Sequence, residues 1–247
     1  MMKFLEKIKT TKDALKCLRE GNEILEAQNV DVTDYDDQFL IESKDFAWSF
    51  PMAARAIKKR QTKLICLEPQ RLEMYAGTGG DYANRDYCVK NNIPITPFPT
   101  PGGAILVNKG DILLIFFTKY SVGMFPFLDY LKPRIAHYLK NICPDAEVTM
   151  PNNDIEIDGK KISGSSKTMK FGTQIESIFF SGVNSTDHVK NLGHKDKNRE
   201  LAGLTDFGIN LEDFKKYVLE LITSGMEANE VHREKSKRRG NKPRRIK

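Results

Sequence analysis

The segment NNDIEIDGKKISGSS, residues 152–166, contains two short runs of β-strand character on either side of an Asp-Gly pair. An Asp-Gly pair between such runs is typical of a tight hairpin turn, because both residues tolerate positive φ angles. The second run carries Lys161 directly into small residues, Ser163 to Ser166. We therefore expect a strand that fixes a lysine ammonium group beside backbone that another molecule can approach closely.

The surrounding sequence mixes strand and helix patterns. The run ILLIFF at 112–117 is apolar on both faces, which predicts a central strand, and we expect it to form a hairpin with AILV at 104–107. Residues 124–142 carry an apolar stripe at helical spacing, and Pro133 should kink this helix or mark its start. A last helix is expected at 210–222. This order predicts an α/β (α+β) fold with a mixed, largely antiparallel sheet flanked by helices.

Composition is that of an ordinary soluble globular protein, with 40% hydrophobic and 29% charged residues in 247. No apolar run reaches the length of a membrane span, and the N-terminus has no apolar signal core. The four cysteines form no CxxC pair, which argues against a zinc site and against a disulfide framework. We expect a cytoplasmic protein with reduced thiols.

The basic character of the chain belongs to its C-terminal end. Residues 231–247 hold nine Lys or Arg against one Glu, a net charge of +8, whereas the whole chain carries +6. We therefore expect one folded domain over residues 1–228 and a basic, disordered tail over 229–247. Such a tail attracts anionic partners, for example nucleic acid or an acidic protein.

Three features could meet at one site. The turn Gly102-Gly103-Ala104 lets main-chain N–H groups approach a phosphate or acyl group. Lys161 can neutralise a developing negative charge on a phosphate or carbonyl oxygen. The carboxylate of Asp154 can hold Mg²⁺ or take a proton from an incoming amine. Each feature alone is more often structural, so the argument depends on their combination.

In this order and spacing the chain resembles the lipoate–protein ligase branch of the biotin/lipoate protein ligase superfamily. NNDIEIDGKKISGSS resembles the family segment that carries its catalytic lysine, and PGGAILVNKGDILLIFF resembles its glycine loop and the strand that follows. NRDYCVKNNIPI resembles the helix that enters this loop, and ELAGLTDFGINLEDFKKYVLELI resembles the closing segment. The resemblance covers roughly residues 45–223. It implies a biotin/lipoate ligase fold and transfer of a lipoyl or related acyl group to a protein lysine, through an acyl-adenylate made from ATP.

The resemblance also implies roles for individual residues. Lys161 would contact the acyl carbonyl and the adenylate phosphate. Asn153 and Asp154 would lie near the phosphate, Mg²⁺ and the acceptor lysine, with Asp154 as metal ligand and catalytic residue. The walls of the acyl and phosphate pocket would come from the glycine loop and from the residues after the lysine: Gly102, Gly103, Ala104, Ser163, Gly164 and Ser165. The acceptor would be a lipoyl-acceptor domain or another protein lysine.

The sequence departs from the family pattern where phosphate is expected. The positions of the family's basic pair read Pro97-Phe98-Pro99-Thr100, Pro101 replaces the first glycine of its triplet, and Asn152 replaces an arginine. We therefore expect ATP alone to bind weakly. A non-catalytic binding or assembly protein built on the same fold is an alternative, although retention of Lys161 favours an enzyme.

Cys143 offers a second alternative. Related octanoyltransferases use a cysteine nucleophile without ATP, and Cys143 precedes Lys161 by eighteen residues. A thiolate near a cationic lysine would be a competent nucleophile. The competing interpretation is a small buried hydrophobic residue that follows an apolar helix.

Overall fold

The structure is a computed structural model. It describes residues 39–43, 55–56, 58–59, 61–76, 85–97, 104–119, 124–152, 154–170, 172–183 and 200–240. The strands and helices follow along the chain as β1 (Leu40–Ser43), β2 (Lys63–Leu67), β3 (Glu73–Ala76), α5 (Arg85–Lys90), β4 (Ile95–Pro97), β5 (Ala104–Val107), β6 (Ile112–Lys119), α6 (Phe127–Ile142), β7 (Val148–Thr149), β8 (Glu156–Ile157), β9 (Lys160–Lys161), β10 (Ser163–Lys170), β11 (Thr173–Phe180), the 3-10 helix η1 (Leu204–Phe207) and α8 (Leu211–Gly240).

A five-stranded sheet with the order β1-β2-β6-β11-β10 forms the middle of the molecule. All neighbours in it are antiparallel except β1 and β2. Two three-stranded sheets accompany it, β4-β3-β5 and β7-β8-β9, and β3 and β4 are the one parallel pair in them. The prediction of a mixed, largely antiparallel sheet flanked by helices is therefore confirmed.

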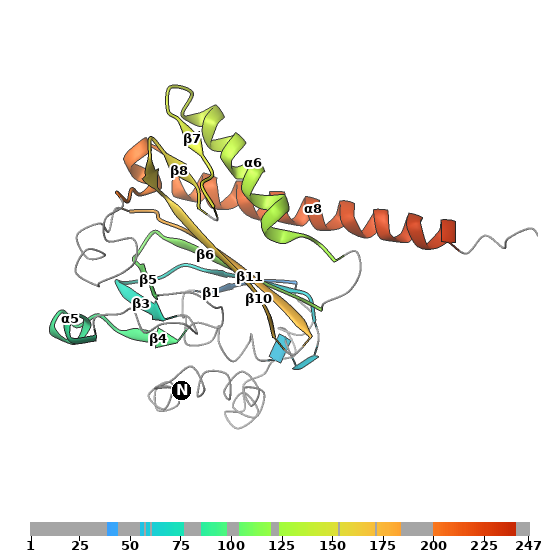
Figure 1. The fold of residues 1–247 in the computed structure, drawn as a ribbon, viewed down its shortest axis with the longest axis horizontal. Helices are drawn as coiled ribbons and strands as arrows, with labels where there is room; N and C mark the ends of the chain where they lie inside the picture. The colour runs from blue at the N-terminus through green and yellow to red at the C-terminus, as the bar shows by residue number, and fades with distance from the viewer. Residues whose placement is uncertain are drawn as a thin grey trace, which may run out of the picture.

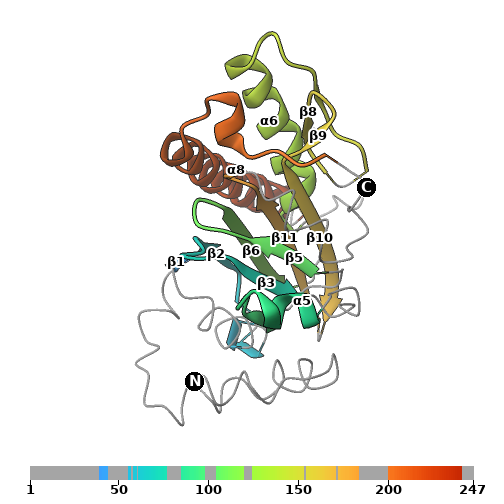
Figure 2. The same cartoon turned by 90° about the vertical axis from the view of Figure 1, so that its left-hand side faces the viewer.

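Strand β6 lies at the centre because both of its faces are apolar. Ile112, Leu114 and Phe116 belong to the large core cluster, and that cluster contains the buried side chains of α6 and α8. The alternate residues of β6, Leu113, Ile115 and Phe117, are also buried and face the opposite way. Figures 1 and 2 show α6 and α8 on one side of the sheet, with β3, β4 and α5 on the other.

The prediction that residues 104–107 and 112–117 form a hairpin is wrong. Strand β5 pairs with β3, whereas β6 pairs with β2 and β11, so the turn between them connects two different sheets. Asp111, at this turn, is almost fully buried, and its carboxylate accepts hydrogen bonds from the N–H groups of Asn108 and Gly182, both at 2.7 Å. The short connection thus ties the small sheet to the end of β11.

Helix α6 begins at Phe127, so Pro133 lies inside the helix and does not mark its start. The Phe127 ring stacks on Phe116 of β6, with ring centroids 4.8 Å apart. The carboxylate of Glu176, buried in β11, accepts a hydrogen bond from the backbone N–H of Leu128 at 2.8 Å. A carboxylate at this position compensates the unpaired N–H groups and the positive end of the helix dipole.

Helix α8 is longer than the expected helix at 210–222, because it continues to Gly240. At 1.5 Å per residue its 30 residues span about 45 Å. A Cβ added at Gly225 would lie 2.5 Å from two ring carbons of Tyr130, so α8 crosses α6 closely at this point. Figure 1 shows the following turns extending past the sheet. The expected boundary at 228 therefore falls within a helix, and residues 229–240, assigned from sequence to a disordered tail, have helical backbone.

Within the described ranges, no helix combines the length and the apolar character that crossing a membrane requires.

Candidate functional site

The Asp-Gly turn forms as the sequence predicts. Ile157 of β8 pairs with Lys160 of β9, which leaves Asp158 and Gly159 as a two-residue connection with φ angles of 51° and 73°. The Asp158 carboxylate also accepts a hydrogen bond from the N–H of Glu147 at 2.8 Å, which holds the turn against the segment before β7. Lys161 consequently emerges from a rigid hairpin.

Lys161 and Asp154 form an ion pair at the base of this hairpin. The Nζ atom of Lys161 lies 3.3 Å from Oδ2 of Asp154, and the two side chains are 15% and 14% exposed. Gly164 adjoins both: an added Cβ there would lie 3.6 Å from Lys161 Cε and 3.7 Å from Asp154 Oδ1. The missing side chain of Gly164 therefore leaves space beside the cation. A largely desolvated ammonium group next to such a space can stabilise negative charge that develops on a bound acyl or phosphate group.

The backbone of Lys161 is held by a second segment. Its N–H donates to the carbonyl of Glu200 at 2.9 Å, and its carbonyl accepts from the N–H of Ala202 at 3.0 Å. Leu201, between these two residues, packs against the core of the small sheet and α5, formed by Met74, Cys88, Ile93 and Leu106. The strand that carries Lys161 is thereby linked to the layer on the far side of the large sheet.

Ser163 and Ser165 lie on a different face from Gly164. Ser163 pairs with Phe180 and Ser165 with Ile178, and both partners belong to the core under α6 and α8. Gly164 alternates to the opposite face, where the Lys161 and Asp154 side chains adjoin it. The three residues therefore do not form one continuous wall, as the sequence interpretation placed them, and Gly164 adjoins the ion pair.

The strand alternation reveals residues that the sequence analysis did not identify. Ser166 of β10 and Ser177 of β11 lie on the Gly164 face, and their hydroxyl oxygens are 2.9 Å apart. The signal was available in the sequence, since residue i+2 of a strand shares the face of residue i. The sequence analysis expected only a short strand here, whereas β10 has eight residues and extends to Lys170.

Of the other predicted site residues, the structure describes some but not all. Gly102, Gly103 and Asn153 lie outside the described residues. Ala104 opens β5, and its backbone pairs with Ala76 of β3. Ala104 thus belongs to the small sheet, the same sheet to which Leu201 connects Lys161.

Cys143 has the environment of a structural residue. It follows the last turn of α6, packs against the large core, and its thiol points to the carbonyl oxygen of Phe207 at 3.9 Å. Desolvation raises the pKa of the Cys143 thiol, and the nearby Asp158 carboxylate raises it further. The C-terminal end of a helix also disfavours a thiolate. These conditions do not favour a nucleophilic role.

Metal-binding capacity is limited in the described part of the chain, which contains no group of three His, Cys, Asp or Glu that could hold a metal ion. At the ion pair the available ligand is the carboxylate of Asp154. One carboxylate together with phosphate oxygens of a substrate is a common way to hold Mg²⁺.

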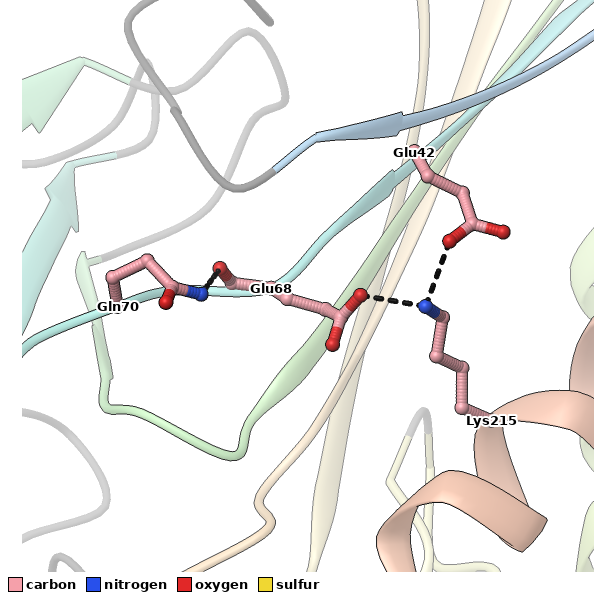
Figure 3. Close-up of polar contacts among 4 residues, drawn as sticks. All are labelled: Glu42, Glu68, Gln70 and Lys215. Atoms are coloured by element: carbon pink, nitrogen blue, oxygen red, sulfur yellow. Dashed lines mark hydrogen bonds and ion pairs between the residues drawn. The ribbon is translucent and has the colours of Figure 1, made fainter.

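A second charged cluster, far from Lys161 in the sequence, fastens α8 to the sheet. The Nζ atom of Lys215 donates hydrogen bonds to Glu42 at 2.8 Å and to Glu68 at 2.6 Å (Figure 3). Desolvation tends to lower the pKa of Lys215, but the hydrogen bonds to Glu42 and Glu68 outweigh it and leave the pKa raised. Beneath the cluster, burial raises the pKa of the Cys66 thiol to about 12, so this thiol is neutral. The cluster joins β1, the end of β2 and the first turns of α8.

Comparisons with known proteins connect this geometry to one family. The family model described as "Lipoyl protein ligase A/B catalytic domain" matches residues 75–223. Lipoate-protein ligase LplJ of Bacillus subtilis is 24% identical over 153 residues, which cover 56% of this chain and 46% of that relative. The chain therefore spans about half the length of this curated relative.

Solved structures share the fold at low sequence identity. LipL1 of P. falciparum in complex with lipoate has a TM-score of 0.62 and 14% identity, and the similarity covers 77% of this chain and 62% of that one. A lipoate-protein ligase A bound with ATP has a TM-score of 0.58 and 17% identity, with 76% and 85% covered. At these identities the likeness establishes the fold.

Proposed function

The chain belongs to the lipoyl protein ligase A/B catalytic domain family, and from this premise we propose that it transfers a lipoyl or related acyl group to a lysine of an acceptor protein through an acyl-adenylate. The observation that carries the proposal is the Lys161–Asp154 pair beside Gly164. The matching family, the related lipoate–protein ligase and the lipoate complex of LipL1 support a lipoyl substrate.

Lys161 contributes a fixed positive charge. When an amine attacks the acyl carbonyl, negative charge develops on the carbonyl oxygen, and a preorganised cation stabilises that charge more in the transition state than in the ground state. The hairpin and the bonds to Glu200 and Ala202 hold the Lys161 backbone, so little reorganisation accompanies this step.

We assign Asp154 two roles in the reaction, one toward the acceptor amine and one toward Mg²⁺. In the transfer step the C–N bond to the acceptor lysine forms, the bond between the acyl carbon and the phosphate oxygen breaks, and AMP leaves. The proton lost by the acceptor amine passes to a carboxylate, and Asp154 is the candidate base. During adenylate formation the same carboxylate would hold Mg²⁺ together with the phosphates of ATP, and Mg²⁺ would neutralise their charge.

ATP use is supported by the fold shared with an ATP-bound ligase. Lys160 is exposed beside Lys161, and Lys109 is exposed on the turn before β6. Pro97 ends β4, and Phe98, Pro99 and Thr100 follow it, so this segment supplies no cation where the family has a basic pair. We propose that the acyl-adenylate is held mainly by its acyl group and by Lys161.

The alternatives receive less support. The environment of Cys143 does not favour an octanoyl- or lipoyltransferase that uses this thiol. A non-catalytic protein on the same fold would not require the desolvated Lys161–Asp154 pair to adjoin a residue without a side chain.

Native mass spectrometry tests the proposed function. After incubation with lipoate, ATP and Mg²⁺, the protein should carry a bound lipoyl-adenylate that is released on denaturation. Octanoate should be tested in parallel, because the proposal covers both a lipoyl group and a related acyl group. A protein that binds neither adenylate would point to the non-catalytic alternative.

The basic C-terminal end is proposed as a separate binding element. The +8 charge of residues 231–247 begins within the part of α8 that extends past the sheet, and it would attract an anionic partner such as nucleic acid or an acidic protein. Deletion of 231–247 should reduce salt-sensitive retention on heparin, and deletion of 241–247 alone should reduce it partly. Equal retention of all three proteins would exclude this role.

A further inference from the structure

Ser163 is a buried residue whose hydroxyl group faces the segment that carries Asp154. Its side chain is 1% exposed, and its Oγ atom accepts a hydrogen bond from the backbone N–H of Ile155 at 2.9 Å. Ser163 is therefore bonded to the residue directly after Asp154. Because it lies on the face under α6 and α8, it does not adjoin the ion pair itself.

Two bonds fix Ile155 to the strand that follows Lys161. The carbonyl of Ile155 accepts from the N–H of Ile162 at 3.0 Å, and the N–H of Ile155 donates to Ser163 Oγ. Strand β8 begins only at Glu156, so the side chain of Ser163 replaces a strand-to-strand bond that the backbone does not make here. Ile155 is itself fully buried, so its N–H group depends on the Ser163 hydroxyl as its acceptor.

The position of the Asp154 carboxylate follows from these bonds. Asp154 is the last residue before this fixed point, and its own N–H donates to the carbonyl of Pro151 at 3.0 Å. Displacement of Ile155 would move the Asp154 carboxylate away from Lys161 Nζ, which now lies 3.3 Å from it.

We propose that Ser163 is a positioning residue, which holds the Asp154 carboxylate against Lys161 through the hydrogen bond to Ile155. The inference concerns the geometry of the ion pair, and its relevance to function rests on the proposed acyl transfer. Sequence resemblance assigned Ser163 to the ligand pocket, whereas its hydroxyl is committed to the backbone behind the pair.

The test measures how readily the Lys161 amine reacts with an acylating reagent, since a lysine held in an ion pair reacts more slowly than a free one. Labelling with acetic anhydride is followed by peptide mass spectrometry, and exposed Lys160 in the same peptide region serves as internal reference. Ser163→Ala should increase Lys161 labelling severalfold relative to Lys160. Asp154→Asn should do the same, and the double variant should label no faster than Asp154→Asn.

Ser181→Ala is the matched control. Ser181 is also buried, and its hydroxyl donates to the carbonyl of Val183 at 2.8 Å, so this variant removes a comparable bond elsewhere. It should leave Lys161 labelling at the wild-type rate. If Ser163→Ala does not fold, Ser163→Cys takes its place, because a thiol is a weaker acceptor and should give an intermediate increase.

Unchanged labelling in folded Ser163→Ala would overturn the inference. Additive increases in the double variant would also overturn it, because Ser163 would then act independently of Asp154. The readout needs neither adenylate nor acceptor, so failure of the proposed enzymatic activity would be seen separately in acyl-transfer assays.

Discussion

Lys161 Nζ lies 3.3 Å from Asp154 Oδ2, and Gly164 of β10 adjoins both side chains. A short hairpin brings the two charges together across seven residues of sequence. The charges are largely desolvated, which strengthens their effect on any group that binds beside them.

Filling the space at Gly164 should impair ligand binding without breaking the pair. The added Cβ of Gly164→Ala would meet Lys161 and Asp154 at 3.6–3.7 Å, which is ordinary van der Waals contact. We expect unchanged thermal stability and an affinity for a lipoyl-adenylate mimic that is lower by about tenfold, or about 1.4 kcal/mol. Calorimetric titration measures this, and equal affinity would place the ligand elsewhere.

The Lys215 cluster should contribute to stability. Lys215→Met removes the cation between Glu42 and Glu68 and leaves two carboxylates near each other. Since Glu42 is half exposed, we expect a loss of about 1–2 kcal/mol in the free energy of unfolding, measured with urea. Lys216→Met, at the exposed neighbouring position, is the control and should change stability little. If the two variants lost the same free energy of unfolding, the ion pairs of Lys215 would make no specific contribution to stability.

Asp111 should make stability depend on pH. Burial raises its pKa from 3.8 to about 7, although hydrogen bonds from Asn108, Gly182 and Val183 act in the opposite direction. Between these values the folded state holds a proton that the unfolded state has lost. The contribution of Asp111 is therefore fully present below pH 3.8 and declines as the pH rises to about 7.

The check is the slope of unfolding free energy against pH, compared between wild type and Asp111→Asn. We expect the variant to be less stable at every pH, because an amide has one acceptor oxygen whereas the Asp111 carboxyl accepts bonds on both of its oxygens. The slope of its unfolding free energy between pH 4 and 7 should nevertheless be more positive than that of the wild type. The expected difference is about 2.303RT per pH unit, which corresponds to one bound proton. Identical slopes would mean that Asp111 titrates alike in both states.

ATP alone should bind much more weakly than the acyl-adenylate. A triphosphate carries about four negative charges and normally requires Mg²⁺ and several basic donors. The segment from Pro97 to Thr100 contains no cation. Calorimetry with ATP–Mg²⁺ and with a non-hydrolysable lipoyl-adenylate mimic separates the two affinities. Tight binding of ATP alone would show that other basic residues replace those missing from the family pattern.

Local signals in the sequence identified much of the fold. The Asp-Gly turn, the apolar strand β6 and the stripe of α6 each depend on neighbouring residues, and each forms as expected. The prediction of a β5–β6 hairpin was wrong because strand pairing depends on partners far along the chain, here β3 for β5 and β11 for β6. The length of α8 was underestimated because its charged C-terminal turns lack the apolar stripe on which the helix prediction depended.

For the candidate site, the sequence named the residues but not the face of the strand on which each of them lies. Lys161, Asp154 and Gly164 were recognised from motif and spacing, and the structure brings these three together. The orientation of Ser163 required the register of β10 on β11, which places it opposite Phe180. No local pattern gives that register, because a run of small residues has no polar and apolar alternation.

The most direct test of the proposed function is acyl transfer from preformed lipoyl-adenylate to a lipoyl-acceptor domain, followed by intact-protein mass spectrometry. Wild type should add one lipoyl group to the acceptor lysine. Lys161→Ala should slow this transfer by about 10²–10³-fold, because one preorganised charge at a developing oxyanion contributes about 2.7–4 kcal/mol. It should melt close to wild type, and Lys160→Ala should transfer at nearly the wild-type rate. Equal rates for wild type and folded Lys161→Ala, or no transfer by wild type, would contradict the account.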